Sequence, residues 1–331
     1  MILRTLLALL PVIPALQLPA QQLRLLAQND QVSLRGLSVV SDRVIWVSGS
    51  HGMVGKSVDS GATWQWTTVP HFETRDFRDI EAFDDREAVI MAIAEPAVIL
   101  KTKDGGHSWQ KVFEDSSKGM FLDAMDFSDR RHGMLVGDPV NGKFFIRSTE
   151  DGGDSWQPLS TPPPPAGDGE GCFAASGTNI LLGSNRHYVI VSGGKLSSFI
   201  SDTGKYTLSL LQGKESTGAN SISAWNGKNL VITGGDFSSD RDTSGNCLLS
   251  FDGGLTWRKP VIAPHGYRSC VAYLSQRDLI CCGTSGVDIS RDGGLRWALV
   301  STDSYHACGK SKTGRSVFLA GSKGRIAKLM L

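Results

Sequence analysis

One short pattern, Ser/Thr-x-Asp-x-Gly-x-x-Trp, recurs along the chain and limits its possible folds more than any other feature. It occurs five times in 331 residues, and a degenerate copy at Asp202-Thr203-Gly204 has Thr207 in place of the tryptophan. Five copies indicate an internal repeat, and such repeats decide the fold. The complete copies cover residues 57–64, 102–109, 149–156, 250–257 and 290–297.

The chemistry of this pattern is that of a tight turn between two strands. A carboxylate at the third position can accept backbone N–H bonds across the turn, and the glycine can take a positive φ. The tryptophan then packs against the neighbouring sheets. We therefore assign a structural role to the five motif aspartates and exclude them from any active site: Asp59, Asp104, Asp151, Asp252 and Asp292.

The spacing of the motifs predicts the number of repeats. Successive aspartates, including Asp202, are 45, 47, 51, 50 and 40 residues apart, which is the length of a four-stranded propeller blade. Residues 298–331 hold further strand-like runs but end without a fourth strand, and residues 22–26 can supply it and cover both sheet edges. The sequence therefore predicts an all-β chain with a single seven-bladed β-propeller of four-stranded blades over residues 21–331, closed by an N-terminal outer strand.

The first 20 residues differ in character from the rest. Arg4 precedes an apolar stretch over residues 6–16 that contains two prolines, and Ala20 stands before a polar pair. This arrangement is typical of a secretory signal peptide, because the apolar run is too short for a membrane span. No later stretch approaches ~20 uninterrupted apolar residues. We expect residues 1–20 to be a signal peptide and the protein to be exported, periplasmic or secreted, with no transmembrane span.

Composition and short motifs argue against several classes of function. Lys and Arg total 34 against 33 Asp and Glu, so bulk charge gives no basis for a nucleic-acid partner. The seven histidines show no metal-binding spacing, no nucleotide fingerprint follows a strand, and no CxxC pair occurs. We expect no metal and no cofactor, and a buried, structural role for the six cysteines: Cys172, Cys247, Cys270, Cys281, Cys282 and Cys308.

Aligning the blades by their motifs places the starts of the innermost strands in one column. That column reads Arg35, Arg78, Leu122, Glu170, Asn220, Arg268 and His306, with Asp79 and Asp123 next to it. The loops between second and third strands open on the same face and supply Asp138 and Asp236. Ligands of propellers bind where such loops converge. The candidate ligand-binding residues are therefore Arg35, Arg78, Asp79, Asp123, Asp138, Glu170, Asp236, Arg268 and His306.

These residues allow two interpretations. The arginines of blades 1, 2 and 6 could face the acids of blades 3 to 5 across the mouth and hold the carboxylate of a partner protein or of an acidic glycan. Alternatively, the same charges could pair with one another as a structural network that lines the channel. The sequence leaves both open.

The motif is similar to the Asp-box, or bacterial neuraminidase repeat, of β-propellers. Together with the stretches 34–38, 76–83, 138–142, 170–176, 234–236 and 266–269, it resembles exported bacterial propellers related to the photosystem II stability and assembly factor. The resemblance covers nearly the whole chain after the leader. It implies a module that binds or assembles other proteins, and we separately expect a monomer. Members are often named oxidoreductase, for which this sequence offers no cofactor motif.

A second resemblance, to sialidases and other Asp-box glycoside hydrolases, supplies the alternative function. Sialidases hold a substrate carboxylate with three arginines, and Arg35, Arg78 and Arg268 could imitate that set. Glycoside hydrolysis by two carboxyl groups, such as Asp138 and Glu170, is also conceivable in chemistry. However, the Arg-Ile-Pro of sialidases is absent here, and sialidases have six blades. The assembly-factor resemblance favours binding over catalysis.

Overall fold

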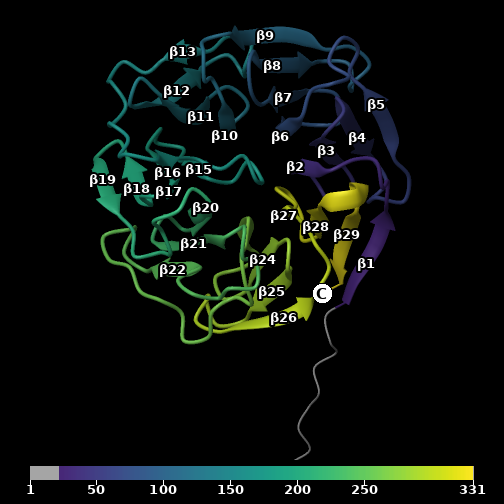
Figure 1. Cartoon of the computed structure of the whole chain (residues 1–331). Coiled ribbons are helices and arrows are strands. Elements are labelled where there is room, and N and C mark those ends of the chain that lie inside the picture. The colour runs from purple at the N-terminus through teal and green to yellow at the C-terminus, as the bar shows by residue number, and fades with distance from the viewer. Residues whose placement is uncertain (1–21, 331) are drawn as a thin grey trace, which may run out of the picture.

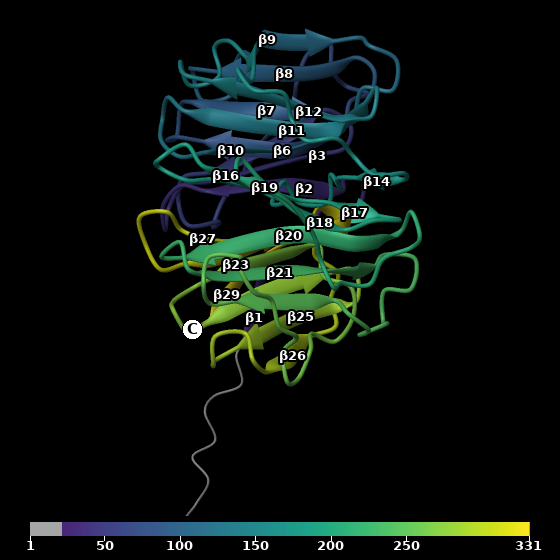
Figure 2. The same cartoon turned by 90° about the vertical axis from the view of Figure 1, so that its left-hand side faces the viewer.

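A computed structural model describes residues 22–330, and the signal peptide expected over residues 1–20 lies outside the described residues. Seven sheets stand around a central axis like the blades of a propeller (Figure 1). The side view shows the ring edge-on, with the sheets stacked from top to bottom (Figure 2). No helix in the described part of the chain is long and apolar enough to cross a membrane. The predicted all-β, seven-bladed propeller is confirmed.

Five of the blades follow the expected order of four antiparallel strands, numbered from the axis outward. Blade 1 holds β2 (Leu34–Val39), β3 (Ile45–Gly49), β4 (Met53–Ser57) and β5 (Gln65–Thr68), and blade 2 holds β6 (Phe77–Ala82), β7 (Ala88–Ala92), β8 (Ala97–Thr102) and β9 (Gln110–Asp115). Blade 3 holds β10 (Leu122–Phe127), β11 (Gly133–Val140), β12 (Lys143–Thr149) and β13 (Gln157–Pro158). Blade 6 holds β23 (Cys270–Tyr273), β24 (Leu279–Gly283), β25 (Gly286–Ser290) and β26 (Trp297–Ser301). Blade 7 holds β27 (Ala307–Lys310), β28 (Val317–Ala320), β29 (Ile326–Met330) and β1 (Gln22–Ala27), with the short 3-10 turn η1 (Ser322–Gly324) before β29.

Blades 4 and 5 depart from this order. Blade 4 holds β15 (Ile180–Leu182), β16 (Tyr188–Val191), β18 (Ser198–Ser201) and β19 (Gly204–Thr207). Blade 5 holds β20 (Thr217–Trp225), β21 (Asn229–Asp236) and β22 (Cys247–Ser250), and a single bridge from Leu249 to Arg258 takes the place of a regular fourth strand. Two short strands, β14 (Glu170–Gly171) and β17 (Gly193–Gly194), extend the blade 5 sheet at its inner edge.

The placement of Glu170 at the start of an innermost strand was wrong. The innermost strand of blade 4 is β15, in which Ile180 pairs with Ile190 just as Ile80 of blade 2 pairs with Ile90. Glu170 lies in β14, on an excursion that pairs with β17 instead. This excursion follows blade 3 at the point in the sequence where the first strand of blade 4 was expected. Its distance from the preceding motif therefore did not distinguish it from a blade strand.

The N-terminal strand closes the ring as predicted. β1 pairs antiparallel with β29, with Gln22 opposite Met330 and Leu25 opposite Ala327. Leu23 packs against the buried cluster between blades 6 and 7. The first and last strands of the described chain therefore lie in one sheet.

The core lies between blades rather than inside them. The middle strands pack on both faces, so β7 reads Ala-Val-Ile-Met-Ala without polar alternation and is buried throughout. Such short, continuous apolar runs are typical of strands buried on both faces. Between blades 1 and 2, for example, Trp46, Phe77 and Ile90 form one cluster against which the motif residue Trp109 packs. All six cysteines are buried and unpaired, in agreement with the expectation of a core role.

The five complete motifs share one set of turn hydrogen bonds. In the first, Ser57 Oγ donates to Asp59 Oδ1 (2.8 Å) and accepts the N–H of Gly61 (2.9 Å), while Asp59 Oδ1 accepts the N–H of Thr63 (2.9 Å). Bonds from the Thr63 side chain and backbone lower the pKa of Asp59 from 3.8 to about 2. A lowered carboxyl pKa stabilises the fold above the unfolded pKa, and that stabilisation is lost as pH falls toward about 2. The same bonds recur at Asp104, Asp151, Asp252 and Asp292.

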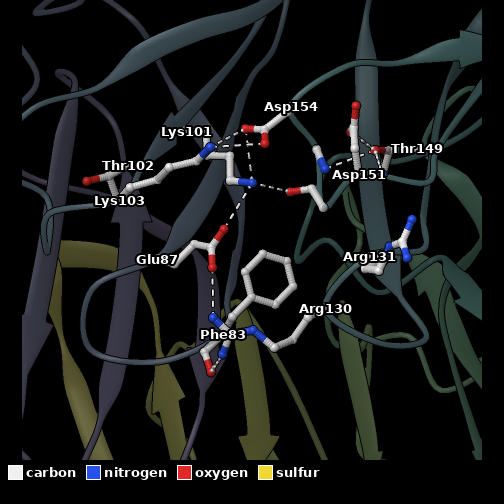
Figure 3. Close-up of polar contacts among 12 residues, drawn as sticks. Phe83, Glu87, Lys101, Thr102, Lys103, Arg130, Arg131, Thr149, Asp151 and Asp154 are labelled. Carbon is white, nitrogen blue, oxygen red and sulfur yellow. Dashed lines mark hydrogen bonds and ion pairs between the residues drawn. The ribbon is translucent and has the colours of Figure 1, made fainter.

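A buried ion network fixes the third motif to the preceding blade (Figure 3). The Lys101 side chain, from β8, is almost fully buried, and its Nζ lies 3.0 Å from Glu87 and 3.1 Å from Asp154 of the motif turn. It also donates to the carbonyl of Gly152 (2.8 Å). Arg130 pairs with Glu87 from the other side. A buried ammonium group is tolerated only with such partners, so this network joins blades 2 and 3 on the motif face.

Removal of residues 22–27 tests ring closure. The truncated chain exposes the edge of β29 and the apolar surface beneath Leu23. We expect its melting temperature to fall by at least about 5 °C, which for a chain of this size corresponds to a loss of roughly 2 kcal/mol or more. A melting temperature equal to that of the intact chain, measured by circular dichroism, would contradict ring closure by β1.

Replacement of Asp104 by alanine tests the turn geometry. The change leaves the amide of Ser108 and the hydroxyl of Thr102 without their acceptor, so we expect a loss of about 1 to 3 kcal/mol in the free energy of unfolding. Denaturant titration measures the loss. Asp104→Asn, which keeps one acceptor oxygen, serves as the matched control and should lose less.

Candidate functional site

In four blades the innermost strand begins with a β-bulge, and these bulges help to build the site. The pairing of β2 with β3 skips Arg35, that of β6 with β7 skips Arg78, and that of β20 with β21 skips Asn220. A bulge leaves its extra residue outside the ladder and re-aims its side chain. In blade 3 the skipped residue is Asp123, so the equivalent of Arg35 there is Asp123 and not Leu122.

The bulge residues Arg35, Arg78 and Asn220 line a pocket of about 460 Å³ at the mouth, which we call the mouth pocket. Four of the predicted site residues line it: Arg35, Arg78, Asp138 and His306. It lies on the face opposite the repeat motifs, because the strand starts and the loops between second and third strands share one end of each blade. The structure thus brings these four candidate residues together on the face that the sequence analysis selected.

The two arginines are the principal charges of the mouth pocket. Arg78 Nε donates to Asp76 Oδ2 (2.8 Å), and Arg78 Nη1 approaches the carbonyl of Ala174 (3.4 Å). Arg35 Nη1 approaches the carbonyl of Ala175 at 3.5 Å. Burial, and then the charge of Arg78, lower the pKa of Arg35. Two guanidinium groups thus share a partly buried space with few strong hydrogen bonds.

His306 adds a neutral group to the same pocket. It is 5% exposed, and its Nε2 lies 2.9 Å from Ser322 Oγ and 3.4 Å from Ser33 Oγ. Burial, followed by the charges of Arg35 and Arg78, lowers its pKa to about 3. His306 is therefore uncharged near neutral pH and adds no positive charge.

A segment of blade 4 crosses the channel beneath the pocket. Residues 172–177, the crossing segment, connect β14 to the start of β15 and touch blades on several sides of the ring. Ser176 Oγ donates to the carbonyl of Ser269 in blade 6 (2.7 Å), and the N–H of Cys172 donates to Asp138 Oδ1 in blade 3 (2.9 Å). The crossing segment therefore lines the pocket and joins blades 3 and 6 across the axis.

Aromatic side chains form one wall of the mouth pocket. We call Phe173, Phe237 and Tyr267 the aromatic wall. Phe173 and Phe237 meet edge to face with ring centroids 5.7 Å apart, and Phe237 and Tyr267 meet in the same way at 6.2 Å. The hydroxyl of Tyr267 donates to Asn220 Oδ1 (2.8 Å). Sequence reasoning missed these residues, although Phe237 and Tyr267 directly adjoin Asp236 and Arg268, which it had selected.

Arg268 does not belong to the mouth pocket, which corrects its assignment. It is fully buried and forms an ion pair with Asp288 of β25, which is also fully buried. Its Nε donates to Asp288 Oδ2 (2.7 Å), and its Nη1 donates to the carbonyl of Tyr267 (2.8 Å). The arginine set expected from the sialidase resemblance is thus not assembled, because one member is neutralised within its own blade.

The carboxylates of Glu170 and Asp236 form structural contacts outside the mouth pocket. The Glu170 side chain is fully buried, pairs with Lys205, and accepts bonds from Ser192 Oγ (2.6 Å) and the N–H of Gly167 (2.6 Å). Asp236 Oδ1 accepts the N–H of Ser238 (2.9 Å) and so shapes the turn after β21. Both carboxylates hold backbone in place, and neither lines the mouth pocket.

The remaining acids are buried to different extents. Asp79 accepts the N–H groups of Ile80 (2.8 Å) and Met125 (2.7 Å), so it joins blade 2 to blade 3. Asp123 is fully buried, and burial, followed by the proximity of Asp138, raises its pKa well above the usual value. Asp138 alone faces the pocket, and burial raises its pKa as well. The expected arc of four acids opposite the arginines is therefore reduced to Asp138.

No group of three or more His, Cys, Asp or Glu side chains within residues 22–330 is arranged to hold a metal ion. The mouth pocket instead combines two arginines, one acid and an aromatic wall. Such an arrangement can bind an anionic group with an apolar neighbour.

Comparisons with known proteins agree with this fold. Residues 20–119 match the family model described as photosynthesis system II assembly factor YCF48. The solved structure of YCF48 bound to D1 peptide is similar over 96% of this chain and 97% of its own, with a TM-score of 0.68 and 17% identity. YCF48 from Cyanidioschyzon merolae matches over 93% and 98%, with a TM-score of 0.64 and 16% identity. The GH74 xyloglucanase from Xanthomonas campestris matches over 93% of this chain but 53% of its own, with a TM-score of 0.60 and 13% identity. No curated protein matches the sequence, and the predicted resemblance to YCF48-like propellers is confirmed.

The two kinds of arginine can be separated by mutation. Arg268→Ala removes the charged partner of the buried Asp288 and leaves its carboxylate with contacts from His265 alone among the described residues, so we expect a loss of about 3 to 5 kcal/mol in the free energy of unfolding. Arg78→Ala removes a partly exposed ion pair, and the melting temperature should stay within a few degrees of wild type. Thermal and denaturant unfolding of both variants checks this difference, and equal losses would contradict the assignment.

Proposed function

We propose that this YCF48-like propeller is an exported, non-catalytic module that binds a partner protein through the mouth pocket. The family match and the shared fold favour a protein-binding or assembly module. The solved structure described as YCF48 bound to D1 peptide gives a precedent for a peptide ligand on such a propeller. The proposal that the protein is exported rests on the leader-like composition of residues 1–20.

One observation carries the proposed ligand chemistry. Arg35 and Arg78 converge on one pocket, and Arg35 forms no ion pair with any residue between 22 and 330. The hydrogen bond of its guanidinium group goes to a backbone carbonyl at 3.5 Å, a long contact for a charged donor. A carboxylate placed between the two guanidinium groups would offer short, charge-assisted bonds to both. We therefore propose a carboxylate of a partner protein, from a side chain or a chain terminus, as the group that is bound.

The contacts of the other candidates favour binding over hydrolysis. A glycosidase needs one carboxyl group free to transfer a proton and a second to act on the sugar. Glu170 is fully buried and holds Lys205, Ser192 and Gly167, so it is not available for either task. Arg268 is likewise occupied by Asp288. Two of the residues that the hydrolase alternative requires, Glu170 and Arg268, are thus committed to the fold.

Arg35→Ala and Arg78→Ala, singly and together, test the proposal. The probes are an acetylated pentapeptide with a free C-terminal carboxylate, its amidated counterpart, and a sialylated trisaccharide. Each charge-assisted bond contributes ~1.5–3 kcal/mol, so each variant should weaken binding of the carboxylate peptide about ten- to hundredfold in calorimetry. The amidated peptide should bind the wild type as weakly as the free-acid peptide binds the variants.

Arg186→Ala is the matched control, because this exposed arginine pairs with Glu150 on the motif face. It should leave binding unchanged. Equal binding by the double variant Arg35→Ala/Arg78→Ala would contradict the proposal. Preference for the trisaccharide over the peptide would replace a protein partner with an acidic glycan.

A further inference from the structure

The aromatic wall leaves apolar surface open beside the arginines. Phe237 is 46% exposed although it stands in a pocket and already contacts Phe173 and Tyr267. Phe173 and Phe237 line the same pocket as Arg35 and Arg78. A ligand that reaches the guanidinium groups therefore also meets an uncovered aromatic surface.

Local hydrogen bonds hold the aromatic wall in place. The N–H of Phe237 donates to the carbonyl of Ser216 (3.1 Å), and Asp236 closes the turn on its other side. Asn179 Nδ2 donates to the carbonyl of Phe173 (3.3 Å). The backbone of both phenylalanines is thus fixed without a ligand, and a preorganised surface loses little conformational entropy on binding.

The mouth pocket continues in two directions across the face of the ring. It shares Asp138, Cys172 and Phe173 with a pocket of about 690 Å³ beside β14 and β17. On the other side it shares Thr284 with a pocket of about 490 Å³ near blades 5 and 6. A compact ligand would fill only the centre, whereas an extended chain can pass from the centre into the neighbouring pockets.

Building on the proposed function, we propose that the mouth pocket selects an extended polypeptide segment in which a large apolar or aromatic side chain adjoins the bound carboxylate. The carboxylate lies at Arg35 and Arg78, and the apolar side chain packs against Phe237 and Phe173. The flanking backbone continues into the adjoining pockets. Phe237 is then the specificity-determining residue, while the arginines supply the attraction for the anion.

Two capped heptapeptides test this selection, each with one central aspartate and with either phenylalanine or alanine beside it. Both orders of the pair are synthesised, because the direction of the chain in the groove decides which side faces the wall. We expect the better phenylalanine peptide to bind wild type about tenfold more tightly than its alanine counterpart, as aromatic contacts add to burial of apolar area. N-Acetylphenylalanine, which lacks the flanking chain, should bind at least about tenfold more weakly than that peptide.

Phe237→Ala should weaken binding of the phenylalanine peptide more than that of the alanine peptide, and so reduce the preference between the two heptapeptides to within about twofold. Phe237→Leu keeps apolar area without the ring and should give an intermediate preference. Phe251→Ala is the matched control, since Phe251 is 39% exposed but belongs to a repeat motif on the opposite face. Calorimetry or fluorescence anisotropy measures each affinity.

The outcomes separate this inference from the proposed function. Equal weakening of both peptides by Phe237→Ala, or no preference in wild type, would overturn the aromatic selection while arginine-dependent binding stands. Equal affinity for N-acetylphenylalanine would overturn the extended chain. Failure of every carboxylate probe to bind wild type would overturn the proposed function itself, and the inference with it.

Discussion

In every blade but the fifth, where β17 pairs with β20, the innermost strand has one edge with no strand beside it, and the packing of the ring depends on how the amides of those edges are satisfied. A neighbouring blade supplies the acceptors, and it is the preceding blade in every case but the contact between blades 7 and 1. Ser38 Oγ takes the N–H of Ala82, Asp79 that of Met125, and Asp126 that of Leu182. The remaining contacts between blades follow the same pattern. The N–H groups of Ile222, Val271, Cys308 and Lys312 donate, in that order, to the Thr178 carbonyl, Ser221 Oγ, Cys270 Sγ and the Val39 carbonyl. Because an unpaired buried amide is costly, these bonds fix each blade against its neighbour.

This constraint explains why polar residues on the inner strands are poor indicators of a ligand site. Asp79, Ser221 and Cys270 differ in chemistry, yet each accepts an amide from the following blade. Aligning the blades shows that a polar residue is present at a given position of the innermost strand. It does not show whether the group faces solvent or the next strand. The residues left for binding are those that a bulge turns out of the ladder, such as Arg35 and Arg78.

The sequence predicted the architecture well because the determinants of the architecture are local. The motif turn is specified by Ser57, Asp59 and Gly61 within a few residues, so its copies identify the blades without knowledge of distant contacts. Ring closure followed from a count of strands. Blade 4 was misassigned where this local signal is weak: its motif is degenerate, and the excursion through Glu170 has a strand-like composition but pairs with a distant glycine strand.

The site was predictable only in part, because its outcome depends on partners far apart in the sequence. Arg78 and Arg268 occupy the same column, but Asp288 lies within reach of Arg268 alone and withdraws it into the core. Nothing near Arg268 in the sequence identifies that partner. The β-bulges could not be predicted from the sequence either, because they depend on the register of the neighbouring strand.

The titratable groups that line the mouth pocket determine how its charge changes with pH. His306 is held neutral above about pH 3 by burial and by the arginines, so it does not add positive charge in mildly acidic solution. Asp138 is the only carboxyl group among the described residues that line the pocket, and burial raises its pKa. As pH falls, protonation of Asp138 removes a negative charge from the lining of the pocket, while Asp76 stays paired with Arg78. The attraction for an anion therefore strengthens with acidification until the carboxylate of the ligand is itself protonated, and Asp138, not the conspicuous histidine, governs that balance.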